Sequence, residues 1–165
     1  MRARERSKGF ALALALAAAA ACLLPGPAAA DIDPGVRAGL YTDVEEGFIG
    51  VELLTDISRK WYFNPNLEYV FVNDGSLWTL NADAHYDFDV ATPLAIWAGG
   101  GLAVIFREFD DPRLQRLNED DDTEIGLNLI AGAGAKRGAI RPYVQGKFVI
   151  ADETEAVIAV GLRFH

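Results

Sequence analysis

One histidine has neighbours with which it could do chemistry. His85 lies two positions from both Asp83 and Asp87, and side chains two apart in an extended chain share one face. A histidine beside carboxylates can act as a general base or ligate a metal ion. Covalent catalysis also needs a nucleophile within reach, and the nearest serine, Ser76, is distant along the chain. We therefore expect His85 to join a polar network, with no metal and no cofactor bound.

An acidic stretch is the second candidate for chemistry. Its carboxylates could bind a cation, and the residues concerned are Asp110, Asp111, Asp120, Asp121 and Asp122. Calcium loops place a glycine and alternating ligands at fixed positions, and the stretch lacks that spacing. Runs of like charge are usually solvated loops. The sequence therefore predicts an exposed acidic loop with weak cation binding at most.

Charged residues of both signs recur at alternate positions in the rest of the chain. A buried charge is tolerated only when it is paired and hydrogen bonded, so these residues predict an ion-pair network if their faces meet. The candidates are Arg37, Glu52, Glu68, Asp83, Glu124, Arg141, Lys147 and Arg163. The alternative use of such residues is a conducting pore whose charge rings select ions.

The segments that carry these residues alternate with a period of two between turn signals, as β-strands do. We expect eight strands, over residues 35–42, 47–55, 61–72, 77–88, 94–106, 123–135, 140–150 and 155–164. Pro65 weakens the third, because proline lacks the amide hydrogen that a strand ladder uses. The last strand is the clearest, with a fully apolar face that ends on Phe164.

Glycines on the polar face indicate that this face lies inside a narrow barrel. They are Gly99, Gly101, Gly126, Gly132, Gly134 and Gly161. Glycine weakens an open strand, but an eight-stranded barrel is only just wide enough for side chains to fill it. We therefore predict an all-β, eight-stranded antiparallel up-and-down transmembrane β-barrel with a plugged or at most narrow polar lumen.

Aromatic residues on the apolar face lie near strand ends, where a membrane barrel meets the two interfaces. They are Trp61, Trp78, Phe88, Phe106 and Phe164. Other apolar residues lie on the nominally polar face and favour a soluble barrel or sandwich instead: Val70, Trp97, Ile105, Ile130 and Val149. The alternative function is thus a soluble periplasmic β-barrel that binds a small apolar ligand inside.

The first 30 residues are expected to be a cleaved signal peptide, which leaves residues 31–165 as a single domain. Arg2 opens a basic segment, an apolar core spans 10–24, and residues 28–30 form an Ala-Ala-Ala cleavage site. The only cysteine, Cys22, lies within this leader, and acylation there is a minor alternative. Removing four basic residues and one acidic residue changes the formal charge from −9 to −12. Such a charge argues against nucleic-acid binding.

The signal peptide, the eight strands and the aromatic end of the last strand resemble the small outer-membrane β-barrel superfamily that includes the OmpA transmembrane domain and opacity-type proteins. The similarity covers residues 31–165, although Phe164 is penultimate and not last. It implies a periplasmic N-terminus and four outer loops, at residues 43–46, 73–75, 107–122 and 151–154. It also implies insertion machinery that reads the last strand, contact with membrane lipid and lipopolysaccharide, and a monomer.

Some small outer-membrane barrels modify lipids, and this is a second alternative function. Those enzymes use a histidine and a serine near the outer rim. On the implied topology His85 falls toward the periplasmic half of its strand and lacks a serine beside it, so we expect no enzymatic activity.

Overall fold

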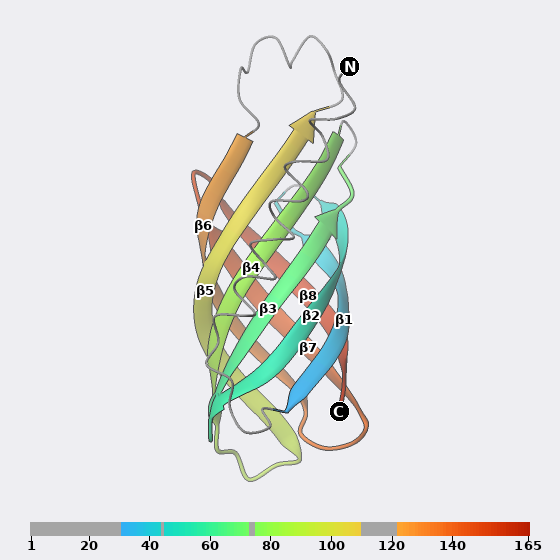
Figure 1. Cartoon of the computed structure of the whole chain (residues 1–165), viewed down its shortest axis with the longest axis vertical. Coiled ribbons are helices and arrows are strands. Elements are labelled where there is room, and N and C mark those ends of the chain that lie inside the picture. The colour runs from blue at the N-terminus through green and yellow to red at the C-terminus, as the bar shows by residue number, and fades with distance from the viewer. Residues whose placement is uncertain (1–30, 44, 73–74, 110–121) are drawn as a thin grey trace. The chain divides into compact units, whose positions relative to one another are not determined.

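The computed structural model of this chain describes residues 31–43, 45–72, 75–109 and 122–165. These residues form antiparallel strands that close into one barrel, in which each strand pairs with its neighbours in sequence and β8 pairs with β1 (Figure 1). The strands are β1 (Ile32–Tyr41), β2 (Glu46–Ser58), β3 (Trp61–Val70), β4 (Gly75–Phe88), β5 (Leu94–Phe109), β6 (Asp122–Ala135), β7 (Ile140–Ile150) and β8 (Thr154–Phe164). The predicted eight-stranded up-and-down barrel is therefore confirmed.

Some strand ends differ from those expected. β1 begins at Ile32, earlier than expected, because β2 continues to Ser58 and provides partners; Ile32 lies opposite Thr55. β5 extends to Phe109 because β4 begins at Gly75, with which Phe109 is paired. The turn signals thus located the turns correctly, but they overestimated the length of the connections between β2 and β3 and between β5 and β6.

Pro65 lies within β3 and is accommodated by a local interruption of the ladder. It is paired with Ala82 of β4 on one side, whereas the β2–β3 ladder is interrupted beside it. The side-chain amide of Asn64 donates to the backbone carbonyl of Leu53 at 2.9 Å. A side-chain donor therefore satisfies a carbonyl of β2 next to the residue that has no amide hydrogen.

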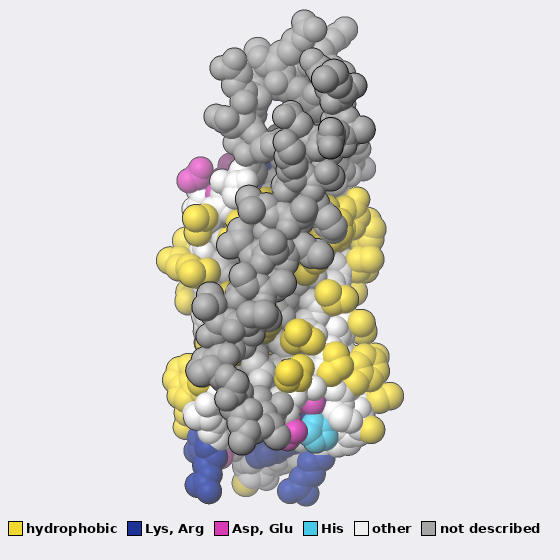
Figure 2. Space-filling model, viewed as in Figure 1, with side chains coloured by type: hydrophobic (Ala, Val, Ile, Leu, Met, Phe, Trp, Pro, Cys, Tyr) yellow, Lys and Arg dark blue, Asp and Glu magenta, His cyan; other side chains and the backbone are white. Residues whose placement is uncertain are grey.

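The apolar face of the strands is the outer face of the barrel. On β6, Ile125, Leu127 and Leu129 are 71%, 56% and 55% exposed, whereas the intervening Asn128 and the next inward residue Ile130 are 1% and 4% exposed. Figure 2 shows hydrophobic side chains on the visible wall of the barrel. The alternative with the apolar face turned inward is therefore wrong. Strands of 10 to 16 residues are also long enough for a tilted crossing, which needs roughly 9–11.

The two ends of the barrel differ in charge. We call the end at which β1 begins and β8 ends the terminal end, marked by the C-terminus in Figure 1, and the opposite end the loop end. Lys and Arg side chains gather at the terminal end beside a few Asp and Glu side chains, and Asp and Glu side chains are also visible at the loop end (Figure 2). The basic residues in the turns of the terminal end are Arg59, Lys60, Lys136 and Arg137.

Aromatic side chains pack together on the wall near both ends. At the terminal end the ring of Tyr86 lies 5.5 Å from that of Trp61 and 5.3 Å from that of Phe88, centroid to centroid. At the loop end the rings of Tyr69 and Trp78 lie 4.8 Å apart. This is the arrangement that two membrane interfaces favour.

Candidate functional site

The middle of the lumen is organised around one fully buried carboxylate. Glu68 Oε2 accepts hydrogen bonds from Lys147 Nζ at 2.8 Å and from the Tyr41 hydroxyl at 2.7 Å. The Thr79 hydroxyl donates to the same oxygen at 3.0 Å, and Arg37 Nε lies 3.3 Å from Oε1. Glu68 on β3 is therefore linked to β1, β4 and β7 at once.

A second buried carboxylate extends this cluster toward the terminal end. Glu52 Oε1 accepts a hydrogen bond from Arg163 Nε at 2.9 Å, and its Oε2 lies 3.6 Å from Arg37 Nη1. Arg37 thus bridges the two glutamates. Charged groups in a low-dielectric interior are tolerated only when they are paired in this way. We call the following six residues the lumen cluster: Arg37, Lys147, Arg163, Glu52, Glu68 and Asp83.

Asp83 enters the cluster through amides. Its two carboxylate oxygens accept from Asn66 at 3.0 Å and from Asn128 at 2.8 Å. Asn81 donates to the side-chain oxygen of Asn66 at 2.9 Å and to the hydroxyl of Thr79 at 3.1 Å. Since Thr79 in turn donates to Glu68, one continuous hydrogen-bonded network connects the carboxylates of β3 and β4.

The Arg163–Glu52 pair joins two strands that are not adjacent, and a glycine makes this possible. Gly35 of β1 lies opposite Glu52 of β2 on one side and opposite Arg163 of β8 on the other. Strands separated by one other strand are about 9–10 Å apart, so the two side chains must cross the strand between them. A Cβ added to Gly35 would lie 2.8 Å from Glu52 Oε1. Only glycine leaves room for this ion pair.

The same arrangement recurs around the lumen. In each case the register places a glycine between two interacting residues of the flanking strands: Gly50 between Arg37 and Glu68, Gly101 between Asp83 and Asn128, and Gly132 between Trp97 and Gln145. In the last case the Trp97 indole donates to the Gln145 side-chain oxygen at 3.2 Å. We call these positions bridging glycines. They explain why glycines alternate with charges on the inner face.

An apolar layer fills the lumen on the loop side of the cluster. Its buried members are Tyr41, Phe48, Val70, Ala103, Ile105, Val149, Val157 and Ala159. Three of these, Val70, Ile105 and Val149, are residues that favoured a soluble barrel in the sequence. That interpretation is wrong, because a narrow lumen has to be filled and apolar side chains fill it as well as polar ones.

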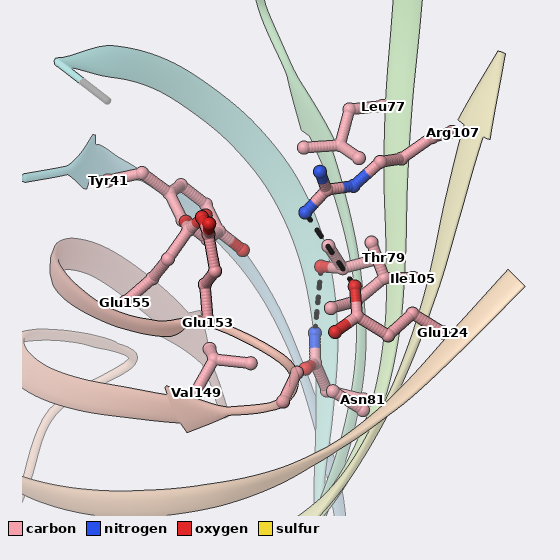
Figure 3. Close-up of a pocket in the computed structure, with 12 residues that line it drawn as sticks. Tyr41, Leu77, Thr79, Asn81, Ile105, Arg107, Glu124, Val149, Glu153 and Glu155 are labelled. Carbon is pink, nitrogen blue, oxygen red and sulfur yellow. Dashed lines mark hydrogen bonds and ion pairs between the residues drawn. The ribbon is translucent and has the colours of Figure 1, made fainter. Parts of the chain in front are cut away.

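A small cavity of about 20 Å³ lies at the loop-end mouth, between this layer and the charged rim (Figure 3). Arg107 Nη2 lies 3.7 Å from Glu124 Oε2 there. Glu153 and Glu155 lie across the opening from this pair, as Figure 3 shows. The space has room for about one water molecule, so this cavity is too small for a ligand.

A larger cavity, about 180 Å³ in volume, lies at the terminal end of the lumen. His85 lines it and is only 2% exposed, with its ring stacked on Tyr62 at 5.5 Å. Its Nε2 lies 3.5 Å from Asp87 Oδ1. The expected grouping of His85 with Asp87 is thus present in space, whereas Asp83 is engaged by the amides of the cluster.

Two of the eight charged residues expected in one lumen network lie elsewhere. Arg141 at the terminal rim pairs with Asp33 and lies 3.1 Å from the His165 ring nitrogen. Glu124 pairs with Arg107 at the opposite mouth. The other six form the lumen cluster. The candidate cation-binding residues Asp110, Asp111, Asp120 and Asp121 lie outside the described residues, and Asp122 is the first residue of β6.

The uncharged members of the network were not predicted from the sequence. Asn66, Asn81, Thr79 and Asn128 carry many of its hydrogen bonds. A signal was available, because Asn66 and Asn81 each precede a network carboxylate by two positions and so share its face.

The described residues contain no group of three or more His, Cys, Asp or Glu side chains that could hold a metal ion. No helix in the described part of the chain has the length and apolarity to cross a membrane.

The fold is similar to that of solved outer-membrane barrels. The N-terminal β-barrel domain of Pseudomonas aeruginosa OprF matches with a TM-score of 0.66 at 12% identity, over 81% of this chain and 95% of that one. Neisserial surface protein A matches with a TM-score of 0.60 at 14% identity, over 83% and 99%. No protein-family model matches the sequence, and no curated protein matches it.

A transmembrane β-barrel designed de novo is also similar, with a TM-score of 0.56 at 14% identity over 86% of this chain and 98% of that one. The chain therefore has the fold of the small eight-stranded outer-membrane barrels, as the sequence resemblance predicted. Because a designed barrel shares the architecture, the role of this chain has to be argued from its own residues.

Proposed function

We propose that this protein is an integral outer-membrane protein with a structural or interaction role and no enzymatic activity. The observation that carries this proposal is the orientation of the two faces of the barrel, with apolar side chains outside and paired charges inside. An apolar outer face is compatible with the hydrocarbon core of a membrane, and a closed sheet leaves no unpaired strand edge in lipid. In water the same wall would be an apolar surface far larger than soluble monomers expose.

The topology follows from the resemblance to small outer-membrane barrels, which implies a periplasmic N-terminus. It also follows from the position of the start of β1 at the terminal end. Residues 1–30 are removed as a signal peptide, and the terminal end faces the periplasm. The insertion machinery reads β8, whose outward face ends on Phe164. The loop end then faces outward with its acidic residues, where the stretch 110–122 contacts lipopolysaccharide through divalent cations. The barrel acts as a monomer surrounded by lipid.

A plugged lumen is part of the proposal. The lumen cluster fills the middle of the barrel, and the apolar layer fills the loop side, so both would have to move before water or ions could pass. A charge-ring pore is disfavoured because the cations and carboxylates bind one another and leave no ring of one sign. A lipid-modifying activity is disfavoured because His85 lies at the terminal end, whereas Ser76 lies near the opposite end of the same strand.

The membrane proposal is tested by fractionating cells that express the full chain and comparing the gel mobility of boiled and unboiled envelope samples. We expect the protein in the outer-membrane fraction, with a faster unboiled band because a closed barrel resists detergent unfolding. Recovery in the soluble periplasmic fraction, with one mobility for both samples, would overturn the proposal.

The plug is tested separately in planar bilayers with the purified barrel. We expect no stable single-channel conductance at neutral pH. Steady ion-selective channels from a monodisperse sample would show that the lumen cluster is a filter and would leave the membrane location intact.

A further inference from the structure

The cavity at the terminal end has polar groups that the protein itself leaves without partners. Within the described residues, Arg163 Nη2 and Arg141 Nε have no acceptor, and His85 Nδ1 and Asp87 Oδ1 have no hydrogen-bond partner. All four residues line the cavity. Arg163 is 6% and His85 2% exposed. Buried polar groups cost free energy unless something satisfies them, so this cavity favours an occupant that can form hydrogen bonds.

The two arginines present free edges of the same kind. Arg163 uses Nε to bind Glu52, and Arg141 uses one Nη to bind Asp33. Each guanidinium therefore retains unused N–H donors beside the cavity. The ammonium group of Lys136, in the β6–β7 turn, adds a third positive charge to the lining. Guanidinium donors are well suited to a carboxylate, which they bind through charge-assisted hydrogen bonds.

The hydrogen-bond acceptors that line the cavity require a different chemical group on the ligand. Asp87 Oδ1, which has only His85 Nε2 at 3.5 Å, can accept a donor from a ligand, and a carboxylate ligand has none. The unpartnered Nδ1 of His85 donates or accepts according to its tautomer. An amino group supplies charged donors and is attracted to Asp87. A ligand that carries both a carboxylate and an amino group would therefore satisfy both sets of groups.

The walls of the cavity are fixed before anything binds. The His85 ring lies between Tyr62 and Trp97, with centroids 5.5 Å from each. The Arg163 guanidinium lies 5.1 Å from the Trp97 ring centroid and 4.3 Å from that of Tyr143. Preorganised aromatic and guanidinium groups reduce the entropy lost on binding. The 180 Å³ of space far exceeds the roughly 10–15 Å³ that one water needs.

We propose that this cavity binds a small amino acid, with its carboxylate at Arg141 and Arg163 and its amino group at Asp87. The site is a property of the lumen and does not depend on the membrane topology proposed above. It would give the barrel a ligand-binding function at the end opposite its acidic loops.

Titration of the purified, folded barrel in detergent micelles with L-alanine tests the proposal, using the indole N–H resonances of the tryptophans. We expect a saturable shift of Trp97, which lines the cavity, and none of Trp61 or Trp78, which lie on the outer wall. Propionate lacks the amino group and ethylamine lacks the carboxylate, so each should bind about tenfold or more weakly. Propionate binding as tightly as alanine would make this a simple anion site and overturn the amino-acid assignment. No saturable shift with any of the three would show that the cavity holds water only.

Two variants and one control localise the site. Arg141→Gln and Asp87→Asn should each weaken alanine binding about tenfold or more, and Arg107→Gln at the opposite mouth should leave it unchanged. Heat-modifiable mobility of each variant verifies that the barrel has closed. Unchanged affinity in both cavity variants would overturn the proposal, and if a variant fails to fold, the ligand series on the unaltered protein still decides it.

Discussion

At the loop side of the lumen, apolar side chains from β1, β2, β3, β5, β7 and β8 fill the interior, whereas at the terminal side aromatic and charged groups line a cavity. Both regions lie inside the same sheet and differ mainly in side-chain chemistry. The loop side needs only volume, because apolar atoms have no bonding requirements. The terminal side contains a cavity and polar atoms that lack hydrogen-bond partners among the described residues. The lumen cluster lies between the two, and the comparison predicts that substitutions in the three zones will have different energetic costs.

The largest cost is expected at the centre of the cluster. Glu68→Ala removes the carboxylate that binds Lys147 and Arg37 and leaves both cations buried, which should lower the free energy of unfolding by about 3–5 kcal/mol. Denaturant unfolding of the barrel in micelles measures this. Glu124→Ala is the matched control, because its pair with Arg107 is partly exposed and worth about 1 kcal/mol or less. Equal costs for the two glutamates would mean that the cluster does not stabilise the fold.

The packed and hollow sides can be compared directly with two truncations. Phe48 is 2% exposed in the apolar layer, with its ring 5.5 Å from that of Tyr41, so Phe48→Ala should cost about 3 kcal/mol or more. His85→Ala only enlarges an existing cavity and should cost about 1 kcal/mol. The same unfolding measurement checks both. If His85→Ala were the more costly, the terminal side would be as tightly packed as the loop side.

Bridging glycines provide a test that is independent of charge. A Cβ at Gly101 would lie 2.3 Å from the Ala82 carbonyl oxygen and 2.4 Å from Asp83 Oδ1, so Gly101→Ala should cost about 1–3 kcal/mol by overpacking. Gly146 faces outward, and its added Cβ would come no closer than 4.0 Å to the Ala131 carbonyl. Gly146→Ala should therefore be neutral or slightly stabilising. A penalty at Gly146 equal to that at Gly101 would indicate a general strand effect and not bridging.

The sequence predicted the strands and the inward face, because alternation assigns each residue to a face. Its predicted network contained the six residues of the lumen cluster together with Arg141 and Glu124, which pair at the two rims instead. The sequence did not predict which charges meet. Arg163 pairs with Glu52 across Gly35 because the register of three strands brings them to one level, and alternation contains no information on register between distant strands. The apolar layer was misread for a related reason: a residue such as Val70 on the polar face looks inconsistent until its level in the barrel is known. The terminal cavity was not predicted, since a gap in packing leaves no pattern in the sequence.

The smallest effect is expected at the terminal rim, outside the lumen. Lys60 and Asp89 form an ion pair between two turns, and Asp89 is 77% exposed. The bond with Lys60 holds the pKa of Asp89 below its usual value and raises that of Lys60. A lowered carboxyl pKa contributes stability that is complete above the ordinary carboxylate range, about pH 4, and is lost as the pH falls through the lowered value. The denaturant midpoint of the unaltered barrel should therefore fall slightly more between pH 6 and 3 than that of Asp89→Asn, and added salt should remove the difference. A difference as large as that produced by Glu68→Ala would contradict the ranking of the zones, because a solvated pair at the rim would then stabilise the barrel as much as the buried cluster does.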